Sequence, residues 1–397
     1  MKNHYQVLIV GGGTAGITVA AQLANSANPP EMAIIEPSNK HYYQPLWTLV
    51  GGGVFDRAES ERNEADYIPA GVTWIQDKVA SFDPDNNKLS TASSGDISYD
   101  WLVVAAGLQI DWHLIPGLKE SVGQPGTGVC SNYSYETVNS TWENIRNFKG
   151  GNAIFTQPAT PIKCAGAPQK IMYLAADHFA KQGIMGKTNV IFGIAAGVIF
   201  GVKKYADTLE KVISRRGLDV RYQHDLQSLD VANRKATFKN LTSGENVTWD
   251  YDMIHVTPPM SAPDFIKQSP LAGATGWVDV DIHTLQHNKY ANVFALGDCS
   301  SLPTSKTGAA IRKQAPTVVA NLAARMKGLP MQGSYDGYTS CPLVTGYGSL
   351  VLAEFDYDKN PQESFPFDQG EERYSMYAMK AYGLPRMYWH GMLRGRA

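Results

Sequence analysis

One cysteine of this chain stands where a thiol is expected to be reactive. Cys164 follows Lys163 in a proline-rich loop, and a helix-compatible run comes next, with Pro168 suited to its first turn. A positive neighbour and a helix N-terminus both favour the thiolate, which is the nucleophilic form of cysteine. A buried, inert cysteine is the ordinary alternative, but a proline-rich loop before a helix is not typical of core packing. The segment therefore predicts a reactive thiol.

The other three cysteines are less informative. Cys341 lies in a loop-like segment with a Cys-Pro step and several glycines, which by itself leaves its role open. Cys299 directly follows Gly297-Asp298 and is expected to pack near that turn, and Cys130 is ambiguous. No Cys-x-x-Cys occurs, so the spacing argues against zinc-ribbon and thioredoxin-like sites, and we expect no metal.

A glycine-rich turn near the N-terminus predicts a dinucleotide site. A strand-like run leads into Gly11-Gly-Gly-Thr-Ala-Gly16, and a helix-compatible run follows. Gly11 allows a tight turn, Gly13 lets a pyrophosphate approach the backbone, and Gly16 lets the helix pack closely on the strand. The phosphates would lie at the helix N-terminus. A second buried strand ends on Glu36, 20 residues past Gly16, where a carboxylate can bind ribose hydroxyls.

Two later buried strands end in small residues, at Gly107 and at Gly297-Asp298. With the first turn, this layout resembles the two-dinucleotide-domain flavoproteins, which include disulfide reductases and type II NADH dehydrogenases. The resemblance covers most of the chain. It implies FAD as the cofactor, with Asp298 against the ribityl and pyrophosphate region.

The segment of this chain that corresponds to the NAD(P)H site of such flavoproteins departs from their glycine pattern. Gly193, Gly197 and Gly201 are spaced G-x-x-x-G-x-x-x-G, and Ala195 stands where the backbone must approach a pyrophosphate most closely. A methyl group there argues against a nicotinamide site. We therefore predict a structural turn in a domain without nucleotide, and a different reductant. A working NADH site is the alternative.

Five longer segments resemble the sulfide:quinone oxidoreductase family, of the type shared by bacteria and mitochondria: residues 41–50, 161–173, 255–261, 302–307 and 341–347. The resemblance implies a redox pair at Cys164 and Cys341, and some bacterial members use a third cysteine in the region of Cys130. It implies that hydrogen sulfide is oxidised to sulfane sulfur, as persulfide or polysulfide, and that two electrons pass through FAD to a quinone. We expect Cys341 to carry the persulfide and Cys164 to engage the flavin, an assignment that the sequence leaves open. The sulfur acceptor would be a thiol, sulfite or sulfide.

The same resemblance implies the residues that contact FAD. A helix-compatible run begins at Gly308, so its N–H groups can stabilise negative charge on the reduced flavin. The full set is Gly11, Gly13, Thr14, Ala15, Gly16, Glu36, Gln44, Val79 (through its backbone), Gly107, Gly297, Asp298, Gly308, Ala309, Ala310 and Ile311.

The elements that position these residues must belong to a large α/β protein. With 397 residues, 43% of them hydrophobic, the chain has room for two or three domains. We expect two Rossmann-like dinucleotide-binding domains and a C-terminal membrane-associated segment. The FAD-binding domain would comprise 1–150 and 285–330, the degenerate second domain 151–284, and the redox-cysteine and quinone region 331–397. The 35 basic and 37 acidic residues give no basic excess, so we expect no nucleic-acid partner.

The C-terminal tail is expected to bind a membrane surface. No apolar stretch approaches the ~20 residues that span a bilayer, but residues 376–397 combine aromatic, methionine and basic side chains, as interfacial anchors do. Pro385 should split the tail into two short helices. The family resemblance implies a monotopic protein whose C-terminal region lies beside the quinone, so we expect nearby aromatic residues such as Phe365 or Tyr382 to line the quinone entrance. Removing the tail should release the protein from membranes and leave FAD bound. Packing of the tail on the protein's own core is the alternative.

The N-terminus resembles neither a signal nor a transit peptide. We therefore expect a peripheral, monotopic protein on the cytoplasmic membrane of a bacterium. The competing hypotheses are a type II NADH:quinone oxidoreductase, the flavin subunit of an exported, cytochrome-linked sulfide dehydrogenase, and a non-catalytic flavin-binding protein. The physiological quinone, covalent attachment of FAD and assembly into a homo-oligomer are left open.

Overall fold

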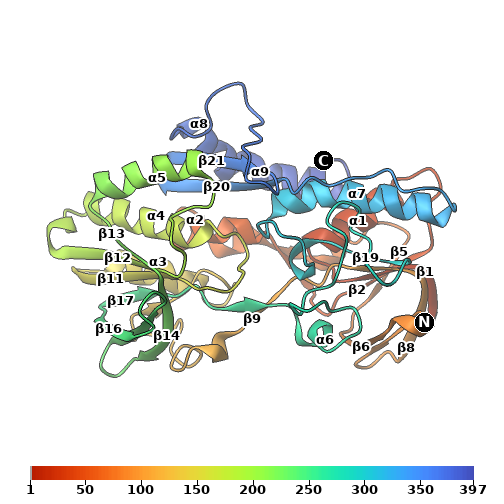
Figure 1. Cartoon of the computed structure of the whole chain (residues 1–397), viewed down its shortest axis with the longest axis horizontal. Coiled ribbons are helices and arrows are strands. Elements are labelled where there is room, and N and C mark those ends of the chain that lie inside the picture. The colour runs from red at the N-terminus through yellow and green to blue at the C-terminus, as the bar shows by residue number, and fades with distance from the viewer. Residues whose placement is uncertain (1) are drawn as a thin grey trace.

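The structure is a computed structural model that describes residues 2–397. Two sheets form two halves of the molecule, and a C-terminal hairpin with a helical tail lies over the region where they meet (Figure 1). Within residues 2–397, no helix has both the length and the apolar character needed to cross a bilayer.

The first half is built on a seven-stranded sheet. Strand β1 is buried along Val7–Val10 and pairs in parallel with β2 and β8, as expected for a strand covered on both faces. Helices α1 (Thr14–Ala24) and α7 (Gly308–Met326) pack against each other in this half. The strands, in spatial order, are β5 (Val72–Ile75), β2 (Met32–Ile35), β1 (His4–Val10), β8 (Asp96–Val104), β7 (Lys88–Thr91) and β6 (Val79–Asp83), with β19 (Val293–Ala295) also on β8.

The second half has a five-stranded parallel sheet, flanked by helices and by a three-stranded antiparallel sheet. The parallel strands, in spatial order, are β10 (Val129–Cys130), β17 (Met253–His255), β11 (Gly151–Gln157), β12 (Thr188–Ile194) and β13 (Asp219–Tyr222). The helices are α2 (Trp47–Gly51), α3 (Val138–Asn147), α4 (Ala167–Lys181) and α5 (Lys203–Arg216), and the antiparallel strands are β14 (His224–Asp230), β15 (Lys235–Asn240) and β16 (Asn246–Asp250).

Short elements complete the frame. A two-stranded ribbon of β9 (Gln109–Ile110) and β18 (Met260–Ser261) runs between the halves (Figure 1). A second ribbon pairs β3 (Lys40–Tyr42) with β4 (Glu61–Asn63), and α6 (Asp264–Lys267) packs near β6.

The C-terminal region begins with an antiparallel hairpin, β20 (Thr339–Gly346) and β21 (Ser349–Phe355), which contacts both α4 and α7. The tail then forms α8 (Tyr374–Ala378) and α9 (Leu384–Arg386), with π-helical turns at Met379–Gly383 and Met387–Gly391. The expected split at Pro385 is therefore wrong, because the helical run continues through it. A π-helical turn on each side changes the hydrogen-bond spacing, which lets the run accommodate a residue without an N–H.

The expected α/β fold with two Rossmann-like halves is confirmed. The division into 1–150 with 285–330, 151–284 and 331–397 stays a prediction. Strand β10 precedes residue 151 and pairs within the second sheet.

Candidate active site

Cys164 lies in a tight turn just before helix α4. Its backbone is left-handed, with φ of +55°, a conformation that costs free energy in a residue other than glycine. Two backbone hydrogen bonds hold it there: the Cys164 N–H donates to the Lys306 carbonyl at 2.8 Å, and the Ala167 N–H donates to the Cys164 carbonyl at 2.7 Å. Pro168 occupies the first turn of α4. The thiol is therefore held close to a helix N-terminus.

The Cys164 turn packs directly on the strand that carries Cys341. A Cβ added at Gly166 would lie 2.4 Å from Leu343 Cδ2 and 3.7 Å from Cys341 Cβ, so the turn lies in direct contact with β20. Cys341 itself is fully buried. A hydrogen bond from the Cys341 thiol holds the pKa of Cys164 well below its ordinary value, and the same bond raises the pKa of Cys341. The two sulfurs thus differ in charge, with the thiolate on Cys164.

Two buried lysines surround the thiolate. Lys170, on α4, places its Nζ 3.1 Å from Cys164 Sγ and helps to lower the pKa of that thiol. Lys380, in the tail, donates to the Pro45 carbonyl at 3.1 Å, and burial lowers its pKa to about 7, assisted by the charge of Lys170. The sequence analysis did not identify either lysine. Lys170 lies in the expected helix after Cys164, where its spacing could have drawn attention, whereas only the tertiary fold brings Lys380 to the site.

The remaining two cysteines have different surroundings. Cys130 is buried in β10, 3.6 Å from the Ile254 carbonyl oxygen, and burial raises its pKa to about 12. Cys299 lies below the Gly297 turn with its Sγ 3.4 Å from the carbonyl oxygens of Val104 and Leu296, and burial raises its pKa to about 11. Both therefore remain protonated thiols at neutral pH.

The first glycine turn has the shape of a cradle. Gly11 has φ of +104°, and a Cβ there would lie 2.5 Å from the Ala105 carbonyl oxygen. A Cβ at Gly16 would lie 1.8 Å from the Gly11 carbonyl oxygen, whereas one at Gly13 would meet no atom within 4 Å. The backbone at Gly11 and Gly16 is thus packed against other backbone atoms, whereas free space lies next to Gly13. Helix α1 begins at this point without a side-chain cap.

Two carboxylates lie next to Gly12 of this turn. Glu36 accepts hydrogen bonds from the Gly12 N–H at 2.9 Å and the Ser38 N–H at 2.7 Å. Glu64 is buried, burial raises its pKa, and its Oε1 has no hydrogen-bond partner among the described residues. The same Oε1 would lie 2.3 Å from a Cβ at Gly12. An unpartnered buried oxygen at a glycine cradle is a feature that a ligand hydroxyl can satisfy.

The Gly297 turn meets the first turn in space. Gly297 has φ of +73°, and a Cβ there would lie 3.3 Å from Ala15 Cβ and 3.5 Å from Ile311 Cδ1. Ile311 belongs to the first turn of α7, which begins at Gly308 and is capped by Thr307. Ala309 and Ala310 lie in the same turn. The N-terminal turns of α1 and α7 therefore meet at one place, as binding of a phosphate-bearing dinucleotide requires.

The other residues assigned to FAD have the following surroundings. Gln44 is exposed and accepts from Lys163 Nζ at 2.7 Å, which joins its loop to the Cys164 segment. Asp298 is half-buried, and burial raises its pKa against the opposing charges of Lys306 and Lys163. Thr14 begins α1, Gly107 has φ of +69°, and Val79 is buried at the start of β6. The two glycine turns and the unpartnered Glu64 oxygen are features that fit a phosphate-bearing dinucleotide such as FAD.

Phe365 and Tyr382, assigned to a quinone entrance, have separate neighbours. Phe365 is half-buried, and its ring stacks on that of Phe367 with centroids 5.3 Å apart. Tyr382 is 56% exposed, and its ring centroid lies 5.9 Å from that of Phe55.

The tail reaches the glycine turn itself, which the sequence analysis missed. The Tyr388 hydroxyl lies 2.8 Å from Thr14 Oγ1 and 2.5 Å from His41 Nε2, and His41 Nδ1 lies 3.0 Å from Glu64 Oε2. Trp389 is buried against the Tyr67 and His41 rings. The tail therefore packs partly on the protein's own core, so we no longer expect that its removal would leave FAD bound.

The second glycine segment, between β12 and α5, packs in part against the protein's own side chains. Ile199 and Phe200 are buried, and the Ile199 carbonyl accepts from Gln169 Nε2 at 3.0 Å. A Cβ at Gly197 would lie 2.8 Å from Gln223 Nε2. This geometry agrees with a structural turn rather than a nucleotide cradle.

Known proteins resemble this chain over nearly its whole length. Residues 5–140 match the family model of pyridine nucleotide-disulphide oxidoreductases. The chain is 52% identical to the mitochondrial sulfide:quinone oxidoreductase of Mus musculus over 395 residues, covering 99% of this chain and 87% of that protein. It is 50% identical to the mitochondrial sulfide:quinone oxidoreductase of Dictyostelium discoideum over 399 residues, covering 100% and 87%. The crystal structure of the Aquifex aeolicus sulfide:quinone oxidoreductase has the same fold, with a TM-score of 0.83, 19% identity, and coverage of 100% of this chain and 92% of that one.

The relatives correct one expectation. We expected a bacterial protein on the cytoplasmic membrane, and this is wrong, because the relatives with about half of their residues identical are mitochondrial proteins of eukaryotes. They point to a mitochondrial location. The sequence interpretation had taken the N-terminal residues as evidence for a bacterium, although a chain's first residues say little about its lineage. With identity of this level across almost every residue, and with the paired cysteines and glycine turns in place, the chain belongs to the sulfide:quinone oxidoreductase family.

Proposed function

We propose that this protein oxidises hydrogen sulfide and reduces a quinone, as a FAD-dependent sulfide:quinone oxidoreductase. The observation that carries the proposal is the contact between a Cys164 thiolate and a Cys341 thiol beside Lys170. When bound, FAD accepts an electron pair from the sulfur chemistry and delivers it to the quinone. The chain's own residues hold the thiols, the charge and the cofactor.

The charge difference between the two sulfurs supports separate roles. In the oxidised pair, a disulfide bond would join Cys164 and Cys341. Hydrosulfide attacks the sulfur of Cys341, a new S–S bond forms there, and the bond to Cys164 breaks with its electron pair. The leaving group with the lower pKa departs faster, and Lys170 stabilises the thiolate that results. This favours Cys341 as the carrier of the persulfide and Cys164 as the electron donor.

An external nucleophile would then remove the sulfane sulfur from Cys341. A thiol, sulfite or sulfide attacks the outer sulfur of the persulfide, and Cys341 is released as a thiolate. Formation of a new sulfur bond between Cys341 and Cys164 then requires removal of two electrons, which is the pair that passes on to the quinone. The net change is the oxidation of one sulfide to sulfane sulfur for each quinone reduced.

We also propose that the tail meets the membrane that holds the quinone. Tyr382 and Arg386 of the tail are exposed, and Leu384 and Met387 are half-buried. Aromatic and apolar side chains next to cations are typical of interfacial binding. The inner face carries Lys380 and Tyr388, so the tail would link the membrane surface to the cysteines and to the flavin turn.

A type II NADH:quinone oxidoreductase is the second candidate, since it shares fold, flavin and quinone. The side chains of Gln223 and Gln169 at the turn between β12 and α5 argue against it. Adding NADH to the purified protein and following flavin absorbance separates the two. Bleaching by sulfide but not by NADH supports the proposal, and bleaching by NADH alone would replace it.

Serine substitutions test the cysteine pair. Cys164→Ser and Cys341→Ser should each abolish sulfide-dependent quinone reduction while FAD stays bound, because each removes one of the two sulfurs. Cys130→Ala should remain active, since its protonated thiol lies in β10. Activity retained in both serine variants contradicts the mechanism, and loss of activity in Cys130→Ala would make that residue a third redox cysteine.

A further inference from the structure

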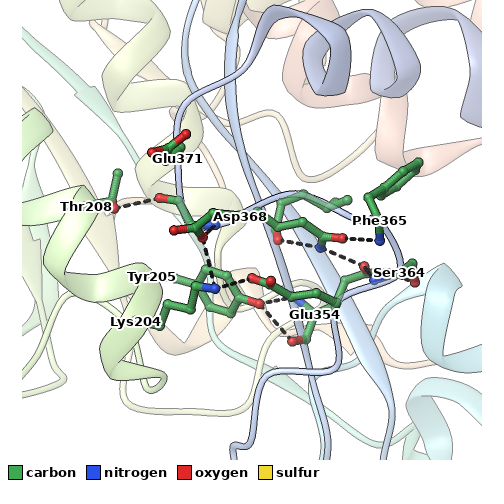
Figure 2. A network of polar contacts seen from close by, with 12 residues as sticks. Lys204, Tyr205, Thr208, Glu354, Ser364, Phe365, Asp368 and Glu371 are labelled. Carbon is green, nitrogen blue, oxygen red and sulfur yellow. Dashed lines mark hydrogen bonds and ion pairs between the residues drawn. The ribbon is translucent and has the colours of Figure 1, made fainter.

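Two buried hydroxyl groups close to the Cys164 turn have no part in the chemistry above. Tyr133 is 3% exposed and Thr257 is 1% exposed, and neither hydroxyl has a hydrogen-bond partner among residues 2–397. The buried Tyr205 differs, since its hydroxyl donates to the Glu354 carbonyl at 3.0 Å (Figure 2). A buried hydroxyl without a partner costs free energy. The two hydroxyls near Cys164 therefore require an explanation.

The fold brings both hydroxyls to the edge of the sheet where Cys164 lies. Strands β10, β17 and β11 are parallel neighbours in the second sheet. Tyr133 follows the carboxyl end of β10, Thr257 follows that of β17, and Cys164 lies in the segment after β11. The carboxyl ends of parallel strands meet at one edge of a sheet, which is where open α/β sheets bind ligands.

Tyr133 is packed with residues on both sides of Cys164. It lies in one buried cluster with Ile162, and Ala167 packs against the same cluster. The Tyr133 carbonyl also accepts from Lys163 Nζ at 2.8 Å. The residues that flank the reactive thiol thus hold this tyrosine beside it.

The charge of the thiolate reaches the Tyr133 hydroxyl. Burial raises the pKa of Tyr133 well above its ordinary value, and the charge of Cys164 raises it further. The Thr257 hydroxyl lies close enough to lower the same pKa, although the two hydroxyls are not aligned in a hydrogen bond. Tyr133 therefore keeps its proton at neutral pH, and this proton is free for donation to an anion.

The intermediate of the proposed reaction lacks a donor that the reduced pair has. In the reduced pair, the Cys341 thiol forms a hydrogen bond with the Cys164 thiolate. Once hydrosulfide has attacked Cys341, the Cys341 sulfur is bonded to the sulfane sulfur and carries no proton. The freed Cys164 thiolate then keeps Lys170 but loses the hydrogen bond from Cys341. A neutral hydroxyl with an unused proton can replace that bond, and hydrogen bonds to an ionised acceptor are strong.

We propose that Tyr133 is a catalytic residue whose hydroxyl, with that of Thr257 beside it, donates a hydrogen bond to the Cys164 thiolate while Cys341 carries the persulfide. This rests on the proposed function, in which the persulfide forms. No covalent bond forms at Tyr133 and no proton leaves it, so the tyrosine stays neutral throughout. The hydrogen bond stabilises the leaving thiolate and so speeds the attack of hydrosulfide on the disulfide.

Alkylation of Cys164 tests the hydrogen bond without any turnover. Cys341→Ala removes the thiol proton, as the persulfide does. In the FAD-loaded Cys341→Ala protein, adding Tyr133→Phe should raise the pH midpoint for alkylation of Cys164 by iodoacetamide by about 1–2 units. With Cys341 in place, the same change should shift the midpoint much less. Tyr251→Phe is the matched control and should leave the midpoint unchanged, because Tyr251 is also buried with an unpartnered hydroxyl but belongs to a separate core cluster.

The sulfide half-reaction tests the consequence for catalysis. In Tyr133→Phe, the rate of flavin bleaching by sulfide should fall about tenfold at neutral pH. Flavin content and melting temperature should stay at the wild-type values, because the lost hydroxyl has no partner within the protein. Tyr205→Phe should show the reverse, with a lower melting temperature and an unchanged rate, since it breaks the hydrogen bond to the Glu354 carbonyl.

Four results would overturn the proposal. The first two are an unchanged midpoint when Tyr133→Phe is added to Cys341→Ala, and equal shifts in Tyr133→Phe and Tyr251→Phe. The third is a shift of the same size with and without Cys341, which would mean that Tyr133 does not take over the role of that thiol. The fourth is loss of FAD from Tyr133→Phe, which would make the hydroxyl a ligand of the cofactor. Failure of the proposed function itself gives a different result, since sulfide would then not bleach the flavin of the wild-type protein, whereas the alkylation midpoints would still shift.

Discussion

The turn between β1 and α1 and the turn between β12 and α5 occupy the same position in the two halves of the molecule. Both follow a buried parallel strand, both are rich in glycine, and both precede a helix. A Cβ at Gly13 in the first turn would meet no atom, whereas a Cβ at Gly197 in the second would meet Gln223, and Ile199 and Phe200 of the second turn are buried. The spacing of the glycines decides whether a turn becomes a cradle for a ligand or a part of the core.

In the second half, a helix N-terminus stabilises a negative charge at the end of β11, the strand next to β12. The turn between β11 and α4 places a charged group at a helix N-terminus, as the first turn would place a phosphate, but here the group is the Cys164 thiolate. The second half thus uses a helix start and nearby cations to hold a negative charge.

Alanine at Gly16 should have the largest effect. Its Cβ would lie 1.8 Å from the backbone oxygen of Gly11, so the turn must shift. We expect destabilisation of about 3 kcal/mol and loss of FAD, measured by flavin content after gel filtration and by thermal unfolding. A Gly16→Ala protein that purifies with a full complement of FAD would show that the turn is no cradle.

Removing the charge of Lys170 should raise the pKa of the Cys164 thiol. The folded pKa of Cys164 lies below its ordinary value, so its thiolate persists as the pH falls below ~8.5 and is lost only when the pH passes the lowered pKa. The stability linked to this thiolate is likewise present above the unfolded pKa and lost as the pH falls through the folded one. In Lys170→Met, the midpoint for alkylation of reduced Cys164 by iodoacetamide should rise by roughly 1–3 pH units. An unchanged midpoint would assign the low pKa of Cys164 to the hydrogen bond from Cys341 and to the charge of Lys380.

Tyr388→Phe should weaken the first turn without touching the second half. It removes the hydroxyl that joins Thr14 and His41 and leaves the buried His41 Nε2 without that partner. We expect a loss of about 1–3 kcal/mol, seen as faster FAD release and a lower melting temperature that added FAD partly restores. Tyr374→Phe, at a 70% exposed position of the same tail, is the matched control. Equal effects in the two variants would contradict a specific contact with the turn.

Alanine at Gly201 should have the smallest effect. A Cβ there meets no atom within 4 Å, and its φ is not among the positive values. The change in unfolding free energy should stay within about 0.5 kcal/mol, with FAD content and sulfide oxidation as in the wild type. A large loss of activity would mean that this turn binds a ligand after all.

Local patterns made much of the site predictable. The glycine spacing from Gly11 to Gly16, the Glu36 carboxylate beyond it and the proline-rich turn at Cys164 all depend on short-range sterics and helix ends, which a sequence displays directly. The family resemblance added Cys341, which its own segment left open. The helical break at Pro385 and the bacterial location were wrong, the first because π-helical turns accommodate the proline and the second because the relatives are mitochondrial.

The order of strands, glycine turns and helices along the sequence was enough to predict the two Rossmann-like halves, which the structure confirms. The flavin turn, the second turn without nucleotide and the reactive thiol stay predictions from patterns of a few neighbouring residues. The surroundings of these segments depend on the tertiary structure, since Lys380 lies near Cys164 and Tyr388 contacts Thr14 across separations in the chain that no spacing rule connects. Such contacts arise when distant segments share one core, where burial and charge depend on every packed element at once.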